Sequence, residues 1–199
     1  MAGKGIVTGG ARLLARNADE IAGVAGRFSE RILDASRRTG IAPDVIDRII
    51  ATDKALRPDV TDYVSPARLA AHARAFENGG SRFTLQSSLD KYGLGQTDGT
   101  TFILPRAEAD RIMAMSGGDP RRLEAALGLP NGQLDSASLV RVDFSPEALD
   151  DLGIRMPNGR EAGANEQWLP GGVLPSGADE ALIDGGRASI NQYSVRVVE

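Results

Sequence analysis

The sequence predicts an α+β fold, in which a helical N-terminal third is followed by a mixed, mainly antiparallel sheet with inserted helices. Three observations support this prediction. Apolar residues recur at helical spacing in the first sixty residues, and short alternating segments follow later in the chain. The two kinds of element are segregated rather than strictly alternating, which argues against a doubly wound parallel sheet.

Two helices are predicted at the N-terminal end. The first covers residues 11–37, where apolar side chains recur three or four positions apart, and Gly40 ends it. The second begins at Pro43, because proline suits the first turn of a helix, and it closes before Pro58. The chain is therefore divided into a helical preamble and an α+β catalytic domain, residues 1–60 and 61–199.

Later helices carry local start signals. A capping side chain followed by proline occurs at Ser65-Pro66, Asp119-Pro120 and Ser145-Pro146. A further helix is predicted over residues 106–115. The strands are predicted at residues 81–85, 100–104, 139–144, 180–184 and 193–198.

Two details of this assignment can be tested by the structure. In the strand 139–144, the alternation predicts that Arg141 and Asp143 face outward while the apolar residues face inward. The polar, glycine-rich segment 89–99 is predicted as a connection between strands rather than as a helix or strand.

Composition excludes several classes of site. The chain has no cysteine, which excludes disulfides, zinc-thiolate sites and cysteine nucleophiles, and its single histidine excludes a multi-histidine metal site. No metal and no membrane-spanning segment are expected. Residues 1–99 carry 14 Lys and Arg against 12 Asp and Glu, whereas residues 100–199 carry 9 against 15. An acidic C-terminal half is unsuited to nucleic acid.

The segment from Gly153 to Gly186 is longer than an ordinary connection and contains the only tryptophan, Trp168. It leads into a short apolar strand headed by Glu180. A carboxylate held by a sheet beside such a loop suits the stabilisation of a developing oxocarbenium ion. On neighbouring strands, Arg82 suits a bidentate grip on a diphosphate, and a hydroxyl of Thr100 or Thr101 can orient either charged group.

His72 lies on the apolar face of the helix that starts at Pro66. Two interpretations are open. The favoured one is a buried histidine whose ring is satisfied by a backbone group, and the other is a general base that lines a cleft.

The run MPNGREAGANEQWLPGGVLPSGADEALID resembles C-terminal toxin domains of bacterial polymorphic toxins, the class delivered by contact-dependent, Rhs-type and type VI or VII systems. The resemblance covers about residues 62–186. Within this class, the order of features is similar to that of ADP-ribosyltransferase toxins. Those proteins carry an Arg or His on the first core strand, a Ser/Thr-rich strand next, and a catalytic Glu at the head of a later strand.

The resemblance implies roles for individual residues. Arg82 would anchor NAD, which is consumed as a substrate, Thr100 and Thr101 would belong to the Ser/Thr strand, and Glu180 would be the catalytic glutamate. Two positions depart from the family pattern: Ala178 stands where a Glu or Gln is frequent, and Gly99 precedes the two threonines in place of a literal Ser-Thr-Ser.

The loop before Glu180 would recognise the target. Its notable residues are Glu161, Asn165, Glu166 and Trp168. Trp168 either stacks on a ligand or, as the favoured alternative, anchors the loop to the body of the protein. The class further implies a secreted or injected effector that acts in the cytoplasm of a target cell. It also implies a macromolecular target there and a cognate immunity protein as partner.

Two other functions remain open. A metal-independent ribonuclease toxin would use His72 as base and Arg82 to stabilise the phosphorane, with Thr84 or Glu166 assisting. Nucleic acid is a partner only under this alternative. The third possibility is a non-enzymatic interaction module whose loop binds a partner.

Overall fold

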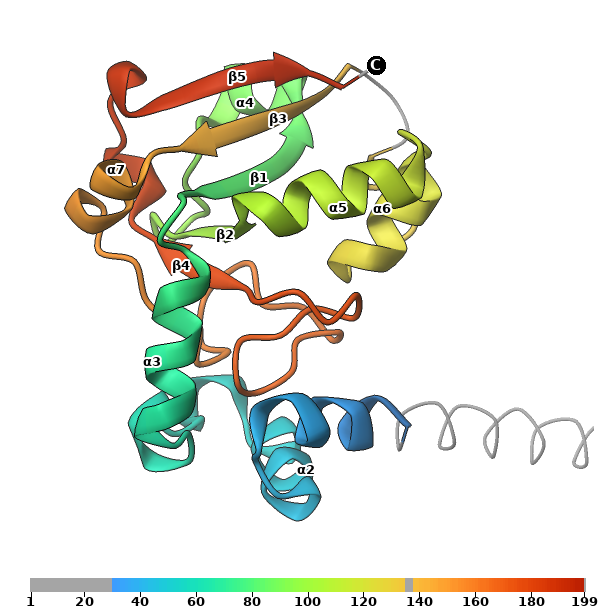
Figure 1. Ribbon diagram of the computed structural model, residues 1–199, viewed down its shortest axis with the longest axis vertical. Coiled ribbons are helices and arrows are strands. Elements are labelled where there is room, and N and C mark those ends of the chain that lie inside the picture. Colours follow the sequence, from blue (N-terminus) through green and yellow to red (C-terminus); the bar gives the residue numbers. More distant parts are fainter. Residues whose placement is uncertain (1–29, 135–137, 199) are drawn as a thin grey trace, which may run out of the picture.

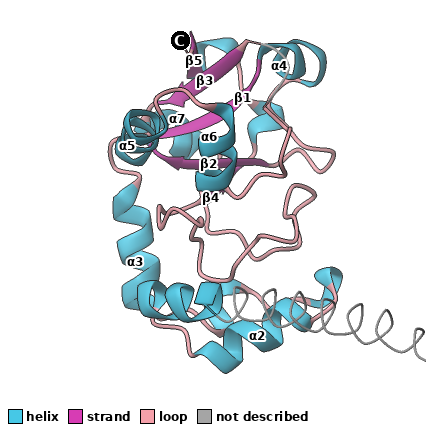
Figure 2. Cartoon of the chain, turned by 90° about the vertical axis from the view of Figure 1, so that its right-hand side faces the viewer, coloured by secondary structure: helices cyan, strands magenta, loops and turns pink. Residues whose placement is uncertain are grey.

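The computed structural model describes residues 30–134 and 138–198, and it confirms the α+β fold. Figures 1 and 2 show three tiers: the sheet with its helices, the irregular segment before β4, and the N-terminal helices. Helix α3 runs from the N-terminal tier to the sheet. The irregular segment therefore lies between the sheet with its helices and the N-terminal helices.

The sheet has five strands in the order β4-β2-β1-β3-β5, and every neighbouring pair is antiparallel. The strands are β1 (Gly80–Leu85), β2 (Thr101–Pro105), β3 (Leu139–Phe144), β4 (Ala181–Ile183) and β5 (Tyr193–Val197). All five predicted strands are present.

The sheet is split between β1 and β2. Gly80 pairs with Pro105 and Ser81 with Leu104, and no further residue pair joins these two strands in the described part of the chain. By contrast, β1 pairs with β3 along its whole length. The two strands therefore diverge after Ser81, and this divergence makes room for the cavity described below.

The helices are α2 (Pro43–Ala51), α3 (Pro66–Ala75), α4 (Gln86–Tyr92), α5 (Arg106–Ser116), α6 (Pro120–Leu127) and α7 (Pro146–Asp151). The predicted capping side chains of Ser65, Asp119 and Ser145 each accept a backbone N–H in the first turn. Residues 30–39 are also helical, and the rest of the helix predicted over residues 11–37 lies outside the described residues.

Helix α4 was not predicted from the sequence. Its seven residues are too few to show a helical period, and Leu89 is the apolar side chain that packs against a buried core. The segment 89–99 is therefore partly helical, and only its second part is a connection.

Buried apolar side chains form three clusters. One lies on the face of the sheet that includes Val142 and Ile183, and a second lies on the opposite face beneath α5 and α6. The third joins Ile32, Ile41 and Ile46 to Met156, Leu169 and Val173. Residues of the predicted preamble thus pack against the long loop. The domain boundary near residue 60 stays a prediction.

The predicted outward orientation of Arg141 and Asp143 is wrong. Both side chains are 6% exposed and form an ion pair, with Nε of Arg141 2.7 Å from Oδ1 of Asp143. Ser81 donates a hydrogen bond to the same carboxylate, Arg196 pairs with it, and Asp110 on α5 pairs with Arg141. Because α5 covers this face of β3, the two charges are buried and compensate one another.

Candidate functional site

A cavity of about 330 Å³ opens where β1 and β2 diverge. This volume lies within the range of small-molecule sites. Its walls come from both strands, from the turn after α6 and from the long loop. The polar and aromatic side chains that line it are Arg82, Phe83, Thr84, Ser88, Gln96, Phe102, Gln133, Asn165, Gln167, Trp168 and Glu180.

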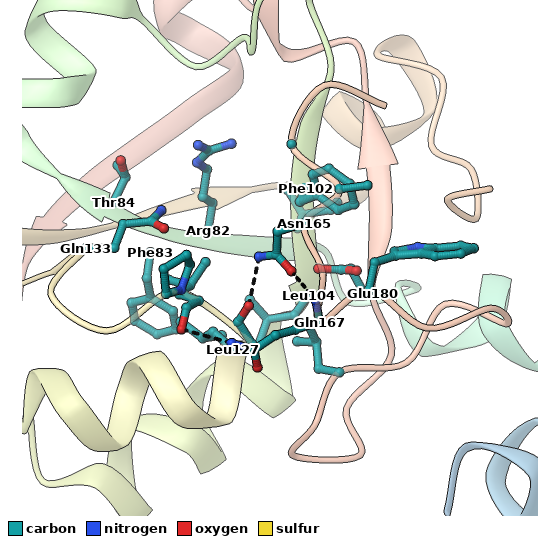
Figure 3. A pocket seen from close by; sticks show the side chains of 18 of the residues that line it. Arg82, Phe83, Thr84, Phe102, Leu104, Leu127, Gln133, Asn165, Gln167 and Glu180 are labelled. Carbon is teal, nitrogen blue, oxygen red and sulfur yellow. Dashed lines mark hydrogen bonds between the residues drawn. The ribbon is translucent and has the colours of Figure 1, made fainter. Parts of the chain in front are cut away.

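Among the described residues that line the cavity, Glu180 is the only acidic one, and it directly precedes β4. Its carboxylate points toward the side chain of Asn165 in Figure 3. Among the described residues, no group donates a hydrogen bond to this carboxylate and no cation pairs with it. Burial, together with the negative charge of Glu161, raises the pKa of Glu180 to about 8. A carboxyl group with this pKa can lose or gain a proton near neutral pH.

Helix α3 fixes the backbone that carries Glu180. The Nε2 atom of His72 is 2.8 Å from the carbonyl oxygen of Glu180. One turn earlier, Arg68 pairs with Asp179 and donates to the carbonyl of Gly171 at 2.9 Å. His72 is 4% exposed, so the structure confirms the expectation of a buried histidine satisfied by a backbone group.

Gly172 completes this support. Its φ angle is +62°, and its carbonyl accepts the backbone N–H of Glu180 at 3.0 Å. A Cβ atom at this position would lie 2.9 Å from the carbonyl oxygen of Glu180. Only glycine therefore lets the loop approach β4 closely enough to hold Glu180 in place.

Arg82 lines the same cavity from β1, and the burial of its guanidinium lowers its pKa. Its Nη1 atom donates to the carbonyl of Leu94 across 3.5 Å, and no carboxylate pairs with it in the described part of the chain. In Figure 3 the guanidinium points away from Glu180. The structure thus brings the two predicted residues to one cavity without contact between their charged groups.

The two predicted threonines do not line the cavity. The hydroxyl of Thr101 donates to the carbonyl of Leu94 at 2.6 Å, and this side chain is fully buried. The hydroxyl of Thr100 donates to Asp98 at 2.7 Å. Both hydroxyls therefore fix the connection before β2, and neither orients Arg82 or Glu180.

Trp168 both lines the cavity and anchors the loop. It is 7% exposed, and the guanidinium of Arg57 lies 4.7 Å from the centre of its ring. Arg57 in turn donates to the carbonyl of Gly159 at 2.8 Å. This cation–π contact joins the segment after α2 to the loop.

The three remaining loop residues differ in their placement. Glu161 accepts the backbone N–H groups of Asn158 and Gly159 at 2.9 and 2.8 Å, so its carboxylate closes a turn. Asn165 lines the cavity and donates to the carbonyl of Gly128 at 2.9 Å. Glu166 is exposed and is not among the lining residues.

Sequence reasoning missed the aromatic walls and the wall after α6. Phe83 and Phe102 each lie on a strand and look like core residues, because nothing local shows that their strands diverge. The turn after α6 is held by Glu124, which accepts the backbone N–H groups of Gly132 and Leu134 at 3.0 and 2.7 Å. These hydrogen bonds, that of Leu134 first, lower the pKa of Glu124.

The residues of the ribonuclease alternative are not gathered at one cavity. Arg82 and Thr84 line the cavity between β1 and β2. His72 lines a different cavity beside α3, and its Nε2 is turned to the backbone of Glu180. A general base and the phosphate-binding cation would have to face the same substrate.

Within residues 30–134 and 138–198, no group of three or more His, Asp or Glu side chains is placed to hold a metal ion. The helices in this part of the chain include none that is long and apolar enough to cross a bilayer. No protein-family model matches the sequence, and no curated protein matches it.

Proposed function

We propose that this chain is an NAD-consuming enzyme of the ADP-ribosyltransferase or NAD glycohydrolase type, and that the cavity between β1 and β2 binds NAD. The observation that carries the proposal is the unpaired carboxylate of Glu180 in a cavity walled by aromatic side chains. A planar nicotinamide ring stacks well on such walls.

The chemistry needs an anion beside the ribose. Cleavage of the bond between nicotinamide and ribose leaves positive charge on the sugar, and a preorganised carboxylate stabilises that charge in a site that excludes water. Glu180 supplies the carboxylate. Since the nicotinamide ring of NAD is itself cationic, its binding favours loss of the Glu180 proton despite the raised pKa.

Arg82 is the candidate partner for the diphosphate. Its hydrogen bond to Leu94 is at the long limit for such a contact, so little is lost when the guanidinium turns to a better acceptor. Burial without a carboxylate partner also favours an anionic ligand.

The strand order supports the resemblance to ADP-ribosyltransferase toxins. Arg82 lies on β1, the threonine-bearing strand β2 is its neighbour, and Glu180 heads β4 on the other side of β2. The hydroxyls do not take the expected orienting role, so the proposal rests on Glu180 and Arg82. As in that class, we propose a secreted or injected effector with a macromolecular target in the recipient cytoplasm and a cognate immunity protein.

Incubation of the protein with labelled NAD and cell lysate tests the proposal, with total RNA and no NAD in a parallel reaction. We expect label on a macromolecule or released free nicotinamide, while the RNA stays intact. The control is Asp47→Asn, which removes an exposed carboxylate of α2 that lines neither cavity, and it should act as the wild type does. Cleavage of RNA without NAD, or no nicotinamide release under any condition, would contradict the proposal.

A further inference from the structure

A second, larger cavity of about 770 Å³ lies beside α3, and it is lined by His72 but not by Glu180. The proposed NAD chemistry makes no use of it. Its walls come from α3, α7 and residues 59–61 and 154–158. The lining side chains that carry the argument are the acidic Glu77 and Asp150, His72, and the half-buried apolar Val60, Leu69 and Ile154.

Its charge is negative. Of the described residues, Asp59, Glu77 and Asp150 line the cavity, and Arg155 is the single basic residue there. Arg155 is already paired with Asp184 at 2.9 Å. Asp59 pairs with Arg160 at 3.1 Å. Glu77 and Asp150 are exposed, and neither forms an ion pair with any described residue. Two carboxylates are thus free to meet a cation.

A second observation indicates that a ligand of this cavity would donate a hydrogen bond to His72. The carbonyl of Glu180 can only accept, so the Nε2 atom of His72 carries the proton of that contact. Burial lowers the pKa of His72, so the ring is neutral at physiological pH and its Nδ1 is an acceptor. No described residue donates to Nδ1, although the ring is 4% exposed and lines the cavity.

We infer that this cavity docks a basic segment of a protein partner, in which Arg or Lys lies next to apolar side chains. The cation would meet Glu77 and Asp150, and the apolar side chains would cover the half-buried Val60, Leu69 and Ile154. A peptide segment supplies a cation and apolar side chains together, whereas a simple cation would leave the apolar lining residues uncovered. The inference is independent of NAD chemistry, because none of these groups faces the cavity of Glu180.

The test uses the full chain and a fluorescein-labelled heptapeptide in which two leucines are flanked by arginines. Binding is followed by fluorescence anisotropy at low salt. We expect the double variant Glu77→Gln/Asp150→Asn to weaken binding about tenfold, since two partly exposed charge pairs are lost. The matched control Asp47→Asn/Asp151→Asn removes two exposed carboxylates that do not line the cavity, and it should change affinity less than about twofold.

A third variant tests whether the peptide needs the space of the cavity as well as its carboxylates. Ala73 is exposed on α3 and lines the cavity, so the ring of Ala73→Phe would occupy part of the cavity and should also weaken binding about tenfold. Circular dichroism confirms that each variant is folded. If the double variant and its control weaken peptide binding equally, the inference is overturned. It is also overturned if the wild type binds the arginine peptide and a peptide with the neutral analogue citrulline in place of arginine with equal affinity.

Discussion

Glu180→Gln is expected to stabilise the protein while it lowers NAD cleavage by about 10²–10³-fold, because the anion that would stabilise the oxocarbenium ion is lost. The stability gain follows from the pKa of Glu180, which folding raises from 4.5 to about 8. Below pH 4.5 both states are protonated. As the pH rises toward 8, the unfolded chain ionises freely but the half-buried carboxyl group of the folded protein does not, so the wild type loses stability.

Glutamine stays neutral and avoids that loss. The variant should therefore gain roughly 3 kcal/mol over the wild type near pH 7, and almost nothing near pH 4. Chemical denaturation at about pH 4, 7 and 9 measures the difference. Asp47→Asn is the control and should change neither stability nor activity, because that side chain is exposed and lines neither cavity. A variant of Glu180 that is less stable at neutral pH would contradict the assigned burial.

Asp143→Ala should destabilise the fold by about 3–5 kcal/mol. The carboxylate of Asp143 pairs with Arg141 and Arg196 and accepts the hydroxyl of Ser81, so its removal leaves the buried guanidinium of Arg141 poorly compensated. Burial alone would raise the pKa of Asp143, but these hydrogen bonds outweigh burial and lower it.

The stability that Asp143 contributes is expected to decrease at low pH. A carboxylate with a lowered pKa contributes stability above its unfolded pKa, near 3.8, and loses it as the pH falls further. The matched control is Asp110→Ala, which removes the other partner of Arg141 but whose side chain is 63% exposed. Urea denaturation should give a loss below about 1 kcal/mol for this control. If Asp143→Ala and Asp110→Ala lower the free energy of unfolding by similar amounts, the burial of the Arg141–Asp143 ion pair is unimportant for stability.

The elements with local signals could be predicted from the sequence. Proline after a capping side chain placed the starts of α3, α6 and α7, and alternation placed β3. Alternation also divides a strand into two faces, but it does not say what covers each face. The inward position of Arg141 and Asp143 depends on α5, which brings Asp110 over β3. That contact is made between elements far apart in the chain.

The same limit applies to the candidate site. Glu180 and Arg82 could be picked out only from their order in the sequence, in which a strand with an arginine, a strand with threonines and a glutamate after a long loop follow one another. Thr101 could not be placed, because its direction follows from the face it shares with Ile103, which packs in a core. The cavity itself comes from the divergence of β1 and β2, and no residue type in either strand signals that divergence.

The most direct test of the account is the pH dependence of kcat/KM for nicotinamide release from NAD, which reports the ionisation of the free enzyme. If the carboxylate of Glu180 is the working group, kcat/KM should rise about tenfold per pH unit from about pH 6 and level off near 8. Glu180→Gln should show almost no activity across this range. A kcat/KM that does not change with pH over this range would contradict the central claim. So would a Glu180→Gln variant whose kcat/KM equals that of the wild type.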